Sequence, residues 1–328
     1  MTVSFVIPCY RSEQTLPGVV REIQDTMSGL AAYEYEIILI NDCSPDHTMD
    51  TIRSLCGDPG EAKRITGIDF TRNFGQHSAL MAGLRESRGD VVICLDDDGQ
   101  TPANEAGKLL EALENGADVA YARYGQKKHS LFRNFGSYLN EEMARFMLDK
   151  PKELIVSSYF AAKRYIVDDM IRYENSYPYV IGLVLRSTRN IVNVDVAHRS
   201  RTVGESGYSL KKLIALWMNG FTSFSVKPLR MATLIGGFSA LIGFIYGIIV
   251  IIQKIVLPER VLGFSSLMAV LVFFGGMIMI MLGLIGEYVG RLYISINNSP
   301  QYVIREIVRD EKQAEERKLL TKDVKEGR

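Results

Sequence analysis

Residues 91–100 read Val91-Val92-Ile93-Cys94-Leu95-Asp96-Asp97-Asp98-Gly99-Gln100, a short apolar run followed at once by three carboxylates. The apolar part has the length and composition of a buried strand, and the polar residues mark its carboxyl end. Four other short runs, rich in β-branched residues, have the same character. These runs are Val3–Ile7, Glu36–Ile40, Ile65–Phe70 and Asp118–Tyr121.

Segments with helical patterns separate these five predicted strands. They are Glu13–Met27, Thr48–Leu55, Ser78–Ser87 and Glu105–Glu114. Alternation of strands and helices predicts an α/β domain with a mostly parallel sheet covered on both faces. In such a sheet the ligand lies outside the carboxyl ends of the strands. The polar clusters stand at those ends: Pro8–Glu13, Asn41–Thr48, Thr71–His77 and Asp96–Gln100.

The middle of the chain has a weaker pattern. Residues 131–148 have a helical pattern, and Ile191–Val196 has the pattern of a strand.

Composition excludes several classes of protein. The chain has 328 residues, and its 38 basic and 38 acidic side chains cancel to a net charge of zero. Zero charge argues against a nucleic-acid partner, and 47% hydrophobic residues argue against a disordered chain. The four cysteines have neither disulfide-framework nor zinc-site spacing, which fits a reducing compartment. No cleavable signal peptide is expected at the N-terminus.

Two long uncharged runs predict membrane helices. Met231–Gln253 has 23 residues and Val261–Gly286 has 26, and neither contains a formal charge. About 20 apolar residues cross a bilayer core roughly 30 Å thick. A buried core helix is the alternative for one such run, but two in close succession favour a membrane hairpin. An excess of basic residues flanking the hairpin favours both termini in the cytoplasm by the positive-inside rule.

The segment before the hairpin is amphipathic, since Lys211 and Lys212 contrast with apolar residues around Trp217. It suits a helix in the headgroup layer, although a solvated helix covering the soluble domain has the same pattern. The predicted division follows from these features. It is a soluble domain at 1–207, an interfacial helix at 208–226, membrane helices at 231–253 and 261–286, and a cytoplasmic tail at 287–328. The charged tail from Arg305 onward is expected to be a helix or a disordered extension.

The acidic triplet is the clearest chemical signal. Side chains alternate along a strand, so Asp96 and Asp98 are expected on one side and Asp97 on the other. Oxygen ligands of this kind suit Mg²⁺ or Mn²⁺, with substrate phosphates completing the shell. A solvated acidic turn is the alternative for the motif taken alone.

The order and spacing of several motifs carry a resemblance over nearly the whole chain. These motifs are Pro8-Cys9-Tyr10, Asn41-Asp42-Cys43-Ser44, Arg72-Asn73-Phe74-Gly75, Asp96–Gln100 and His198-x-x-Arg201-x-x-Gly204. The chain resembles family 2 glycosyltransferases of the polyprenyl-phosphate branch. That branch includes dolichyl-phosphate mannose synthase and bacterial undecaprenyl-phosphate glycosyltransferases. The resemblance implies a GT-A fold, Rossmann-like, followed by the interfacial helix and the membrane hairpin.

The resemblance also implies roles for individual residues. Those matching nucleotide-binding positions are Pro8, Tyr10, Glu13, Asp42 and Asp97. Those matching the metal and diphosphate site are Asp96, Asp98 and Gln100. Those matching the acceptor-phosphate site are Arg123, Arg133 and Ser137. The implied catalytic set is Asp96, Asp98, Arg133 and Arg201.

Two departures from the family pattern lie on the nucleotide side. Arg11-Ser12-Glu13 stands where Asn-Glu-Glu is frequent. Asn41 and Cys43 replace the first and third members of an Asp-Asp-Gly-Ser motif, while Asp42 and Ser44 persist.

The implied function is inverting, metal-dependent transfer of one sugar from a nucleotide sugar to undecaprenyl phosphate. The donor is expected to be UDP-linked and the cofactor Mg²⁺ or Mn²⁺. The expected location is the cell (inner) membrane, with the catalytic domain in the cytoplasm and the lipid bilayer as a partner. A homo-oligomer is compatible with the small-residue spacing in the membrane helices.

Three other functions are compatible with parts of the pattern. A processive polysaccharide synthase would need a Gln-x-x-Arg-Trp motif, but Trp217 follows Leu216. A sugar nucleotidyltransferase would need a Gly-x-Gly-x-Arg loop near the N-terminus, which is absent. A membrane-anchored scaffold that binds a nucleotide sugar without turnover stays open, because sequence does not report turnover.

Overall fold

A computed structural model describes residues 1–60, 62–124, 145, 150–197, 227–256, 264–297 and 299–309. The chain divides into two compact units. The first unit is Met1–Lys212 together with Pro300–Arg328, and the second is Leu213–Ser299. The predicted interfacial helix at 208–226 and most of the predicted helix at 131–148 lie outside the described residues.

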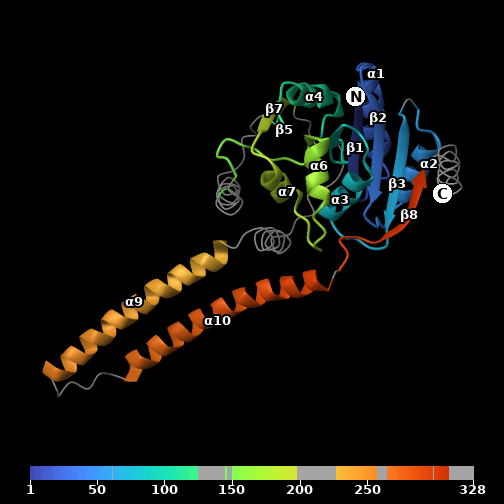
Figure 1. Ribbon diagram of the computed structural model, residues 1–328. Coiled ribbons are helices and arrows are strands. Elements are labelled where there is room, and N and C mark those ends of the chain that lie inside the picture. Colours follow the sequence, from blue (N-terminus) through green and yellow to red (C-terminus); the bar gives the residue numbers. More distant parts are fainter. Residues whose placement is uncertain are drawn as a thin grey trace, which may run out of the picture. The chain divides into compact units, whose positions relative to one another are not determined.

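The first unit contains an eight-stranded sheet in the order β7-β5-β6-β4-β1-β2-β3-β8 (Figure 1). In chain order, its strands are β1 (Thr2–Cys9), β2 (Glu34–Asn41), β3 (Arg64–Phe70), β4 (Val91–Cys94), β5 (Val119–Tyr124), β6 (Phe160–Lys163), β7 (Ile191–Val196) and β8 (Ile304–Arg309). The pairs β1–β2, β1–β4, β2–β3 and β5–β7 are parallel. The prediction of a mostly parallel sheet is therefore confirmed, with β6 and β8 running antiparallel to their neighbours.

Helices cover both faces of this sheet (Figure 1). They are α1 (Leu16–Ser28), α2 (Thr48–Gly57), α3 (Gln76–Glu86), α4 (Ala106–Glu114), α6 (Arg164–Ile171) and α7 (Val180–Ser187), with a 3₁₀ turn, η1 (Ala103–Glu105). The apolar face of α1 packs on Phe5 and Ile7 of β1. On the other face α3 lies so close that a Cβ on Gly83 would stand 2.3 Å from Val6 Cγ1. Glycine at residue 83 therefore permits the close approach of α3 to the sheet.

Strand β8 corrects the prediction for the tail. Residues 305–309 were expected in a helix or a disordered extension, but they extend the sheet as an antiparallel edge strand on β3. The reason is that Ile304, Ile307 and Val308 are β-branched residues suited to a half-buried strand, while the charged residues between them pair with the domain.

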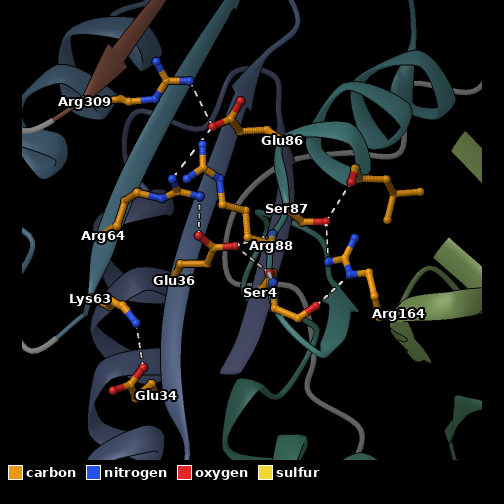
Figure 2. A network of polar contacts seen from close by, with 12 residues as sticks. Ser4, Glu34, Glu36, Lys63, Arg64, Glu86, Ser87, Arg88, Arg164 and Arg309 are labelled. Carbon is orange, nitrogen blue, oxygen red and sulfur yellow. Dashed lines mark hydrogen bonds and ion pairs between the residues drawn. The ribbon is translucent and has the colours of Figure 1, made fainter. Parts of the chain in front are cut away.

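A network of ion pairs lies where the parallel strands begin (Figure 2). Glu36 pairs with Arg64 across β2 and β3, and both side chains are buried. Glu36 also accepts hydrogen bonds from Ser4 Oγ and from the backbone N–H of Arg88, the latter at 2.7 Å. Because each oxygen of Glu36 has partners, the buried charge is compensated. The network stabilises the end of the sheet where the parallel strands begin, opposite the end that carries the acidic triplet.

The second unit is a helical hairpin of α9 (Lys227–Val256) and α10 (Phe264–Ile296) (Figure 1). Each helix contains a segment long and apolar enough to cross a membrane, Ala232–Ile249 in α9 and Phe273–Ile294 in α10. The segment in α10 extends beyond the predicted 261–286. None of the residues whose burial is described in these two segments is buried. Large apolar side chains exposed along both helices suit a lipid environment.

Candidate active site

Strands β4, β1, β2 and β3 are neighbours and run parallel, so their carboxyl ends meet at one edge of the sheet. This edge is where ligands bind in open α/β sheets. The four polar clusters identified in the sequence each follow one of these strands. The structure thus gathers them at a single edge.

Asp96 follows β4, and two neutral donors hold its carboxylate. Gln76, the first residue of α3, donates from Nε2 to Oδ1 at 2.8 Å, and Ser158 Oγ donates to Oδ2. Burial raises the pKa of Asp96 to about 6, the charges of Asp98 and Asp97 add to the rise, and the two hydrogen bonds oppose it. Among the described residues, no basic side chain contributes to the pKa of Asp96. A cation at this carboxylate would therefore be strongly favoured.

Asp97 points to a different loop. Its Oδ2 accepts the backbone N–H of Tyr10 at 2.9 Å and the hydroxyl of Ser12. Burial is the largest cause that raises the pKa of Asp97, and these donors oppose it. The neighbouring carboxylates Asp96 and Asp97 therefore contact separate elements, as side-chain alternation along a strand predicts. Asp97 fixes the loop that follows β1.

Asp98 lies in a tight turn with Gln100. Its Oδ1 accepts the backbone N–H of Gln100 at 3.0 Å, and both residues are half-buried. Gly99 between them has a φ of 71°, a left-handed conformation that favours glycine. Thr101 Oγ1 closes the turn by donating to the Asp96 carbonyl at 3.1 Å. The turn holds Asp96, Asp98 and Gln100 together after β4.

Asp42 organises the loop after β3. Its buried carboxylate accepts the backbone N–H of Phe74 at 2.7 Å and that of Gly75 at 2.8 Å. Burial raises the pKa of Asp42, and these two bonds oppose the rise. The carboxylate implied to bind nucleotide is thus already bonded to the Arg72-Asn73-Phe74-Gly75 segment. Its contribution at this edge is to connect the loops after β2 and β3.

The remaining residues implied to bind the nucleotide lie in β1 and in the loop that follows it. Pro8 is buried in β1, while the side chain of Tyr10 is 46% exposed. The guanidinium of Arg11 lies 5.7 Å from the centre of the Tyr10 ring. Glu13 accepts the backbone N–H of His47 at 2.9 Å, at the N-terminus of α2. Tyr10 is therefore partly exposed at this edge with Arg11 over its ring, whereas Glu13 is engaged by α2.

Arg123 is engaged in an ion pair. Near the end of β5 its Nε and Nη2 donate to the two oxygens of Asp195, at 2.6 and 2.8 Å. The two residues are register partners in β5 and β7, and both side chains are exposed. A phosphate at Arg123 would have to compete with this bidentate carboxylate.

Sequence reasoning missed Gln76 and Ser158 as residues of this edge. Gln76 lies within the Thr71–His77 cluster, so its place near the site was foreseeable, but its contact with Asp96 was not. Ser158 stands in an irregular segment before β6 and has no pattern that would single it out. Its contact with Asp96 spans 62 residues of sequence.

Comparison with known proteins gives this geometry its context. A family model for glycosyl transferase family 2 matches residues 4–171, about half of the chain. Over 313 residues the chain is 34% identical to undecaprenyl-phosphate 4-deoxy-4-formamido-L-arabinose transferase from Aeromonas hydrophila, covering 94% of each chain. The chain belongs to glycosyltransferase family 2. It is a glycosyltransferase with a GT-A domain, so the predicted family, fold and enzyme class are confirmed.

Further comparisons extend the similarity beyond the catalytic domain of this family 2 member. A model for the GtrB C-terminal hairpin matches residues 227–292, which contain most of α9 and α10. The transferase of the same name from Photorhabdus laumondii is 32% identical over 316 residues, covering 94% of this chain and 95% of that protein. The glycosyltransferase therefore carries a membrane-associated hairpin, as the two uncharged runs predict.

Among solved structures, the family 2 domain is similar to glucosyl-3-phosphoglycerate synthase from Mycobacterium tuberculosis in complex with Mn²⁺, UDP-glucose and phosphoglyceric acid. The TM-score is 0.49 at 17% identity, over 66% of this chain and 75% of that chain. Those ligands are properties of the synthase.

Three residues of the predicted site lie outside the described part of this glycosyltransferase. They are Arg133, Ser137 and Arg201.

The acidic residues after β4 fit a divalent cation bound together with substrate. Within the described ranges, no three acidic, histidine or cysteine side chains converge to form a closed metal site. Mg²⁺ in nucleotide-dependent enzymes is held by one or two carboxylates, with substrate phosphates completing its shell. Asp96 and Asp98 supply two carboxylates, and mutual repulsion between them contributes to the raised pKa of Asp96. This donor set suits an ion that arrives with a diphosphate.

Proposed function

We propose that this glycosyltransferase transfers one sugar from a UDP-linked donor to undecaprenyl phosphate at the cytoplasmic face of the inner membrane. The observation that carries the proposal is the similarity, over 94% of the chain, to transferases named for undecaprenyl phosphate. The acidic edge of the sheet and the apolar hairpin are the two features that such an enzyme needs. The product would be a polyprenyl-phosphate sugar used in the cell envelope.

The nucleotide would bind across the loops after β1 and β2. The exposed ring of Tyr10 offers a surface for the base, next to the turn fixed by Asp97. Pro8 and Asp42 would support this part of the proposed site from inside the domain, because both are buried. Glu13 would act through the N-terminus of α2, whose His47 N–H it accepts.

Asp96 and Asp98, with Gln100 beside them, would hold Mg²⁺ or Mn²⁺ at the donor diphosphate. When bound, the cation neutralises negative charge on the leaving nucleoside diphosphate. Gln76 and Ser158 would fix the orientation of the Asp96 carboxylate in this role through their hydrogen bonds. Asp97 would support the nucleotide side by fixing the loop after β1 through its hydrogen bonds from Tyr10 and Ser12.

The acceptor needs placement more than activation. A lipid phosphate is already ionised near neutral pH, so its oxygen can attack the anomeric carbon without a protein base. The bond from carbon to the nucleotide oxygen breaks as the bond to the lipid phosphate forms, and the configuration inverts. Arg133, Ser137 and Arg201 are proposed to hold the phosphates, since guanidinium groups bind phosphate oxygens in pairs.

A donor screen tests the function. Purified full-length protein is incubated with undecaprenyl phosphate, Mg²⁺ or Mn²⁺ and one nucleotide sugar at a time. The mass of the lipid product is then measured by mass spectrometry. The expected result is a lipid phosphate carrying a single sugar from a UDP donor, with no product in EDTA. A polymeric product would indicate a synthase, and absence of product with every donor would indicate a binding scaffold.

A further inference from the structure

Strand β8 follows both membrane helices in the chain, yet it contributes a charged side chain to the catalytic domain. Arg305 Nη1 donates to Asp69 Oδ2 at 2.8 Å, and its Nη2 donates to the carbonyl of Thr71 at 3.3 Å. Asp69 stands near the end of β3 and is almost fully buried, with 1% of its surface exposed. Arg305 is the cation that compensates this buried carboxylate.

A line of hydrogen bonds continues from Asp69 to the loop after β2. Asp69 Oδ1 accepts from Asn41 Nδ2 at 2.6 Å, and Asn41 Oδ1 accepts the backbone N–H of Ser44 at 3.1 Å. Ser44 Oγ in turn accepts the backbone N–H of Arg11 at 2.7 Å. Arg305 is therefore connected through side chains to both loops of the proposed nucleotide site.

The two loops need such support because their backbones are strained. Cys43 has a φ of 50° and Arg11 a φ of 59°, left-handed values that non-glycine residues rarely adopt. Conformations of this kind persist only when surrounding contacts fix them. The thiol of Cys43 also lies 3.8 Å from the Thr71 carbonyl that Arg305 contacts. Cys43 and Arg11 are adjacent in sequence to Asp42 and Tyr10, two residues of the proposed nucleotide site.

We propose that Arg305 is a positioning residue for donor binding, acting through Asp69, Asn41 and Ser44. The proposal rests on the proposed function, since it assigns the donor to these loops. Without Arg305 the buried Asp69 carboxylate would lose the cation that compensates its charge, and it would be held less firmly beside Asn41. Asn41 would then lose a fixed acceptor, and the Ser44 turn would relax. The strand after the membrane hairpin thus completes the nucleotide side of the catalytic domain.

Other contacts hold β8 when Arg305 is replaced. Backbone pairing with β3 runs from Thr66 to Phe70. Glu306 pairs with Arg53 of α2, and Arg309 pairs with Glu86 at 2.9 Å (Figure 2). Glu306 is the register partner of Asp69, but its side chain pairs with Arg53. Glu306→Gln is therefore a matched control, because it removes an ion pair from the residue next to Arg305 and keeps the hydrogen bonds that join Arg305, Asp69, Asn41 and Ser44.

The first test is steady-state kinetics of the full chain, with the donor found by the screen and undecaprenyl phosphate as acceptor. Arg305→Met is expected to raise the KM for nucleotide sugar roughly tenfold, the loss expected for one charged hydrogen bond. The kcat and the KM for lipid phosphate are expected to stay within about twofold. Arg305→Lys keeps a positive charge at Asp69 but lacks the planar guanidinium with its two donors. Its KM for nucleotide sugar is expected to lie between those of the wild type and Arg305→Met. Glu306→Gln is expected to match the wild type.

The second test needs no turnover. Cys43 is half-buried, whereas Cys9, Cys56 and Cys94 are buried, so iodoacetamide should modify Cys43 first. The rate of modification is expected to rise in Arg305→Met and to stay unchanged in Glu306→Gln. An unchanged Cys43 rate in Arg305→Met, equal increases in both KM values, or the same effect in Glu306→Gln would overturn the proposal. A wild type inactive with every donor would instead reject the proposed function, and the Cys43 rates would still decide the coupling.

Discussion

Asp98 is the carboxylate on which the metal assignment can be tested most directly. Replacing it with asparagine keeps the shape of the turn but removes one charge from the proposed cation site. We expect Asp98→Asn to lose at least about a hundredfold in kcat, the scale seen when electrostatic stabilisation of a transition state is removed. The measurement is product formation with Mg²⁺ or Mn²⁺ at saturating donor and lipid.

Asp25→Asn on α1 controls for loss of an acid elsewhere in the domain and should leave kcat unchanged. The thermal midpoint of Asp98→Asn should stay close to that of the wild type, which separates chemistry from folding. Full activity of Asp98→Asn, or of the wild type in EDTA, contradicts the metal assignment.

Asp96 predicts a dependence of stability on pH. Its pKa is about 6 in the folded protein, against a usual value near 3.8, so the folded state holds a proton that the unfolded state has already lost. The stability contributed by this proton is present at low pH and is lost as pH rises through about 6. Asp96→Asn lacks the titrating group. The thermal midpoint of the wild type, measured in EDTA, should therefore fall relative to that of Asp96→Asn between about pH 4.5 and about pH 7.5.

Mg²⁺ provides an internal check, because a bound cation favours the ionised carboxylate. Adding Mg²⁺ near neutral pH should reduce the difference in thermal midpoint between the wild type and Asp96→Asn. If the difference in thermal midpoint between the two proteins does not change with pH, Asp96 titrates at its usual pKa.

The pairing of β2 with β3 contains an ion pair that should matter greatly for stability. Removing Glu36 leaves the buried guanidinium of Arg64 without its close partner, and breaking one half of a buried pair costs about 3 kcal/mol or more. We therefore expect Glu36→Ala to lower the thermal midpoint of the catalytic domain by several degrees. Thermal unfolding in detergent, followed by circular dichroism, measures this change.

The same pair of segments supplies the control. Glu34 and Lys63 also form an ion pair, at 2.7 Å, but their side chains are 66% and 62% exposed (Figure 2). Water competes for such a pair, so Glu34→Ala should shift the midpoint very little. Equal decreases in thermal midpoint for Glu36→Ala and Glu34→Ala would show that burial does not determine how much these ion pairs stabilise the domain.

The elements differ in how well sequence predicts them, for physical reasons. Strands such as β2 are buried on both faces and are therefore continuous apolar runs, which sequence shows directly. Strand β6 has only four residues, Phe160–Lys163, and β8 carries three charges in six residues, so neither resembles a buried strand. The contacts of Ser158 with Asp96 and of Arg305 with Asp69 join residues far apart in sequence. Such pairs depend on the tertiary fold, and a single sequence contains no pattern for them.

The whole molecule combines a catalytic domain with a hairpin that interrupts it in sequence. Residues before and after the hairpin belong to one compact unit, since β8 completes the sheet begun by β1. We therefore expect both ends of the hairpin to lie on the side of the membrane where this domain folds. This conclusion agrees with the positive-inside pattern but does not depend on it.

Reporter fusions test this topology. Alkaline phosphatase, which is active only outside the cytoplasm, should be active when fused after Val256 at the end of α9. Green fluorescent protein, which fluoresces only in the cytoplasm, should be bright when fused at Arg328. A dark C-terminal fusion together with an active one after Val256 would put β8 across the membrane from β3. Since β3 and β8 pair along Thr66–Phe70, that outcome is incompatible with the fold. An inactive phosphatase after Val256 with a bright C-terminal fusion would instead mean that the hairpin enters the membrane without crossing it.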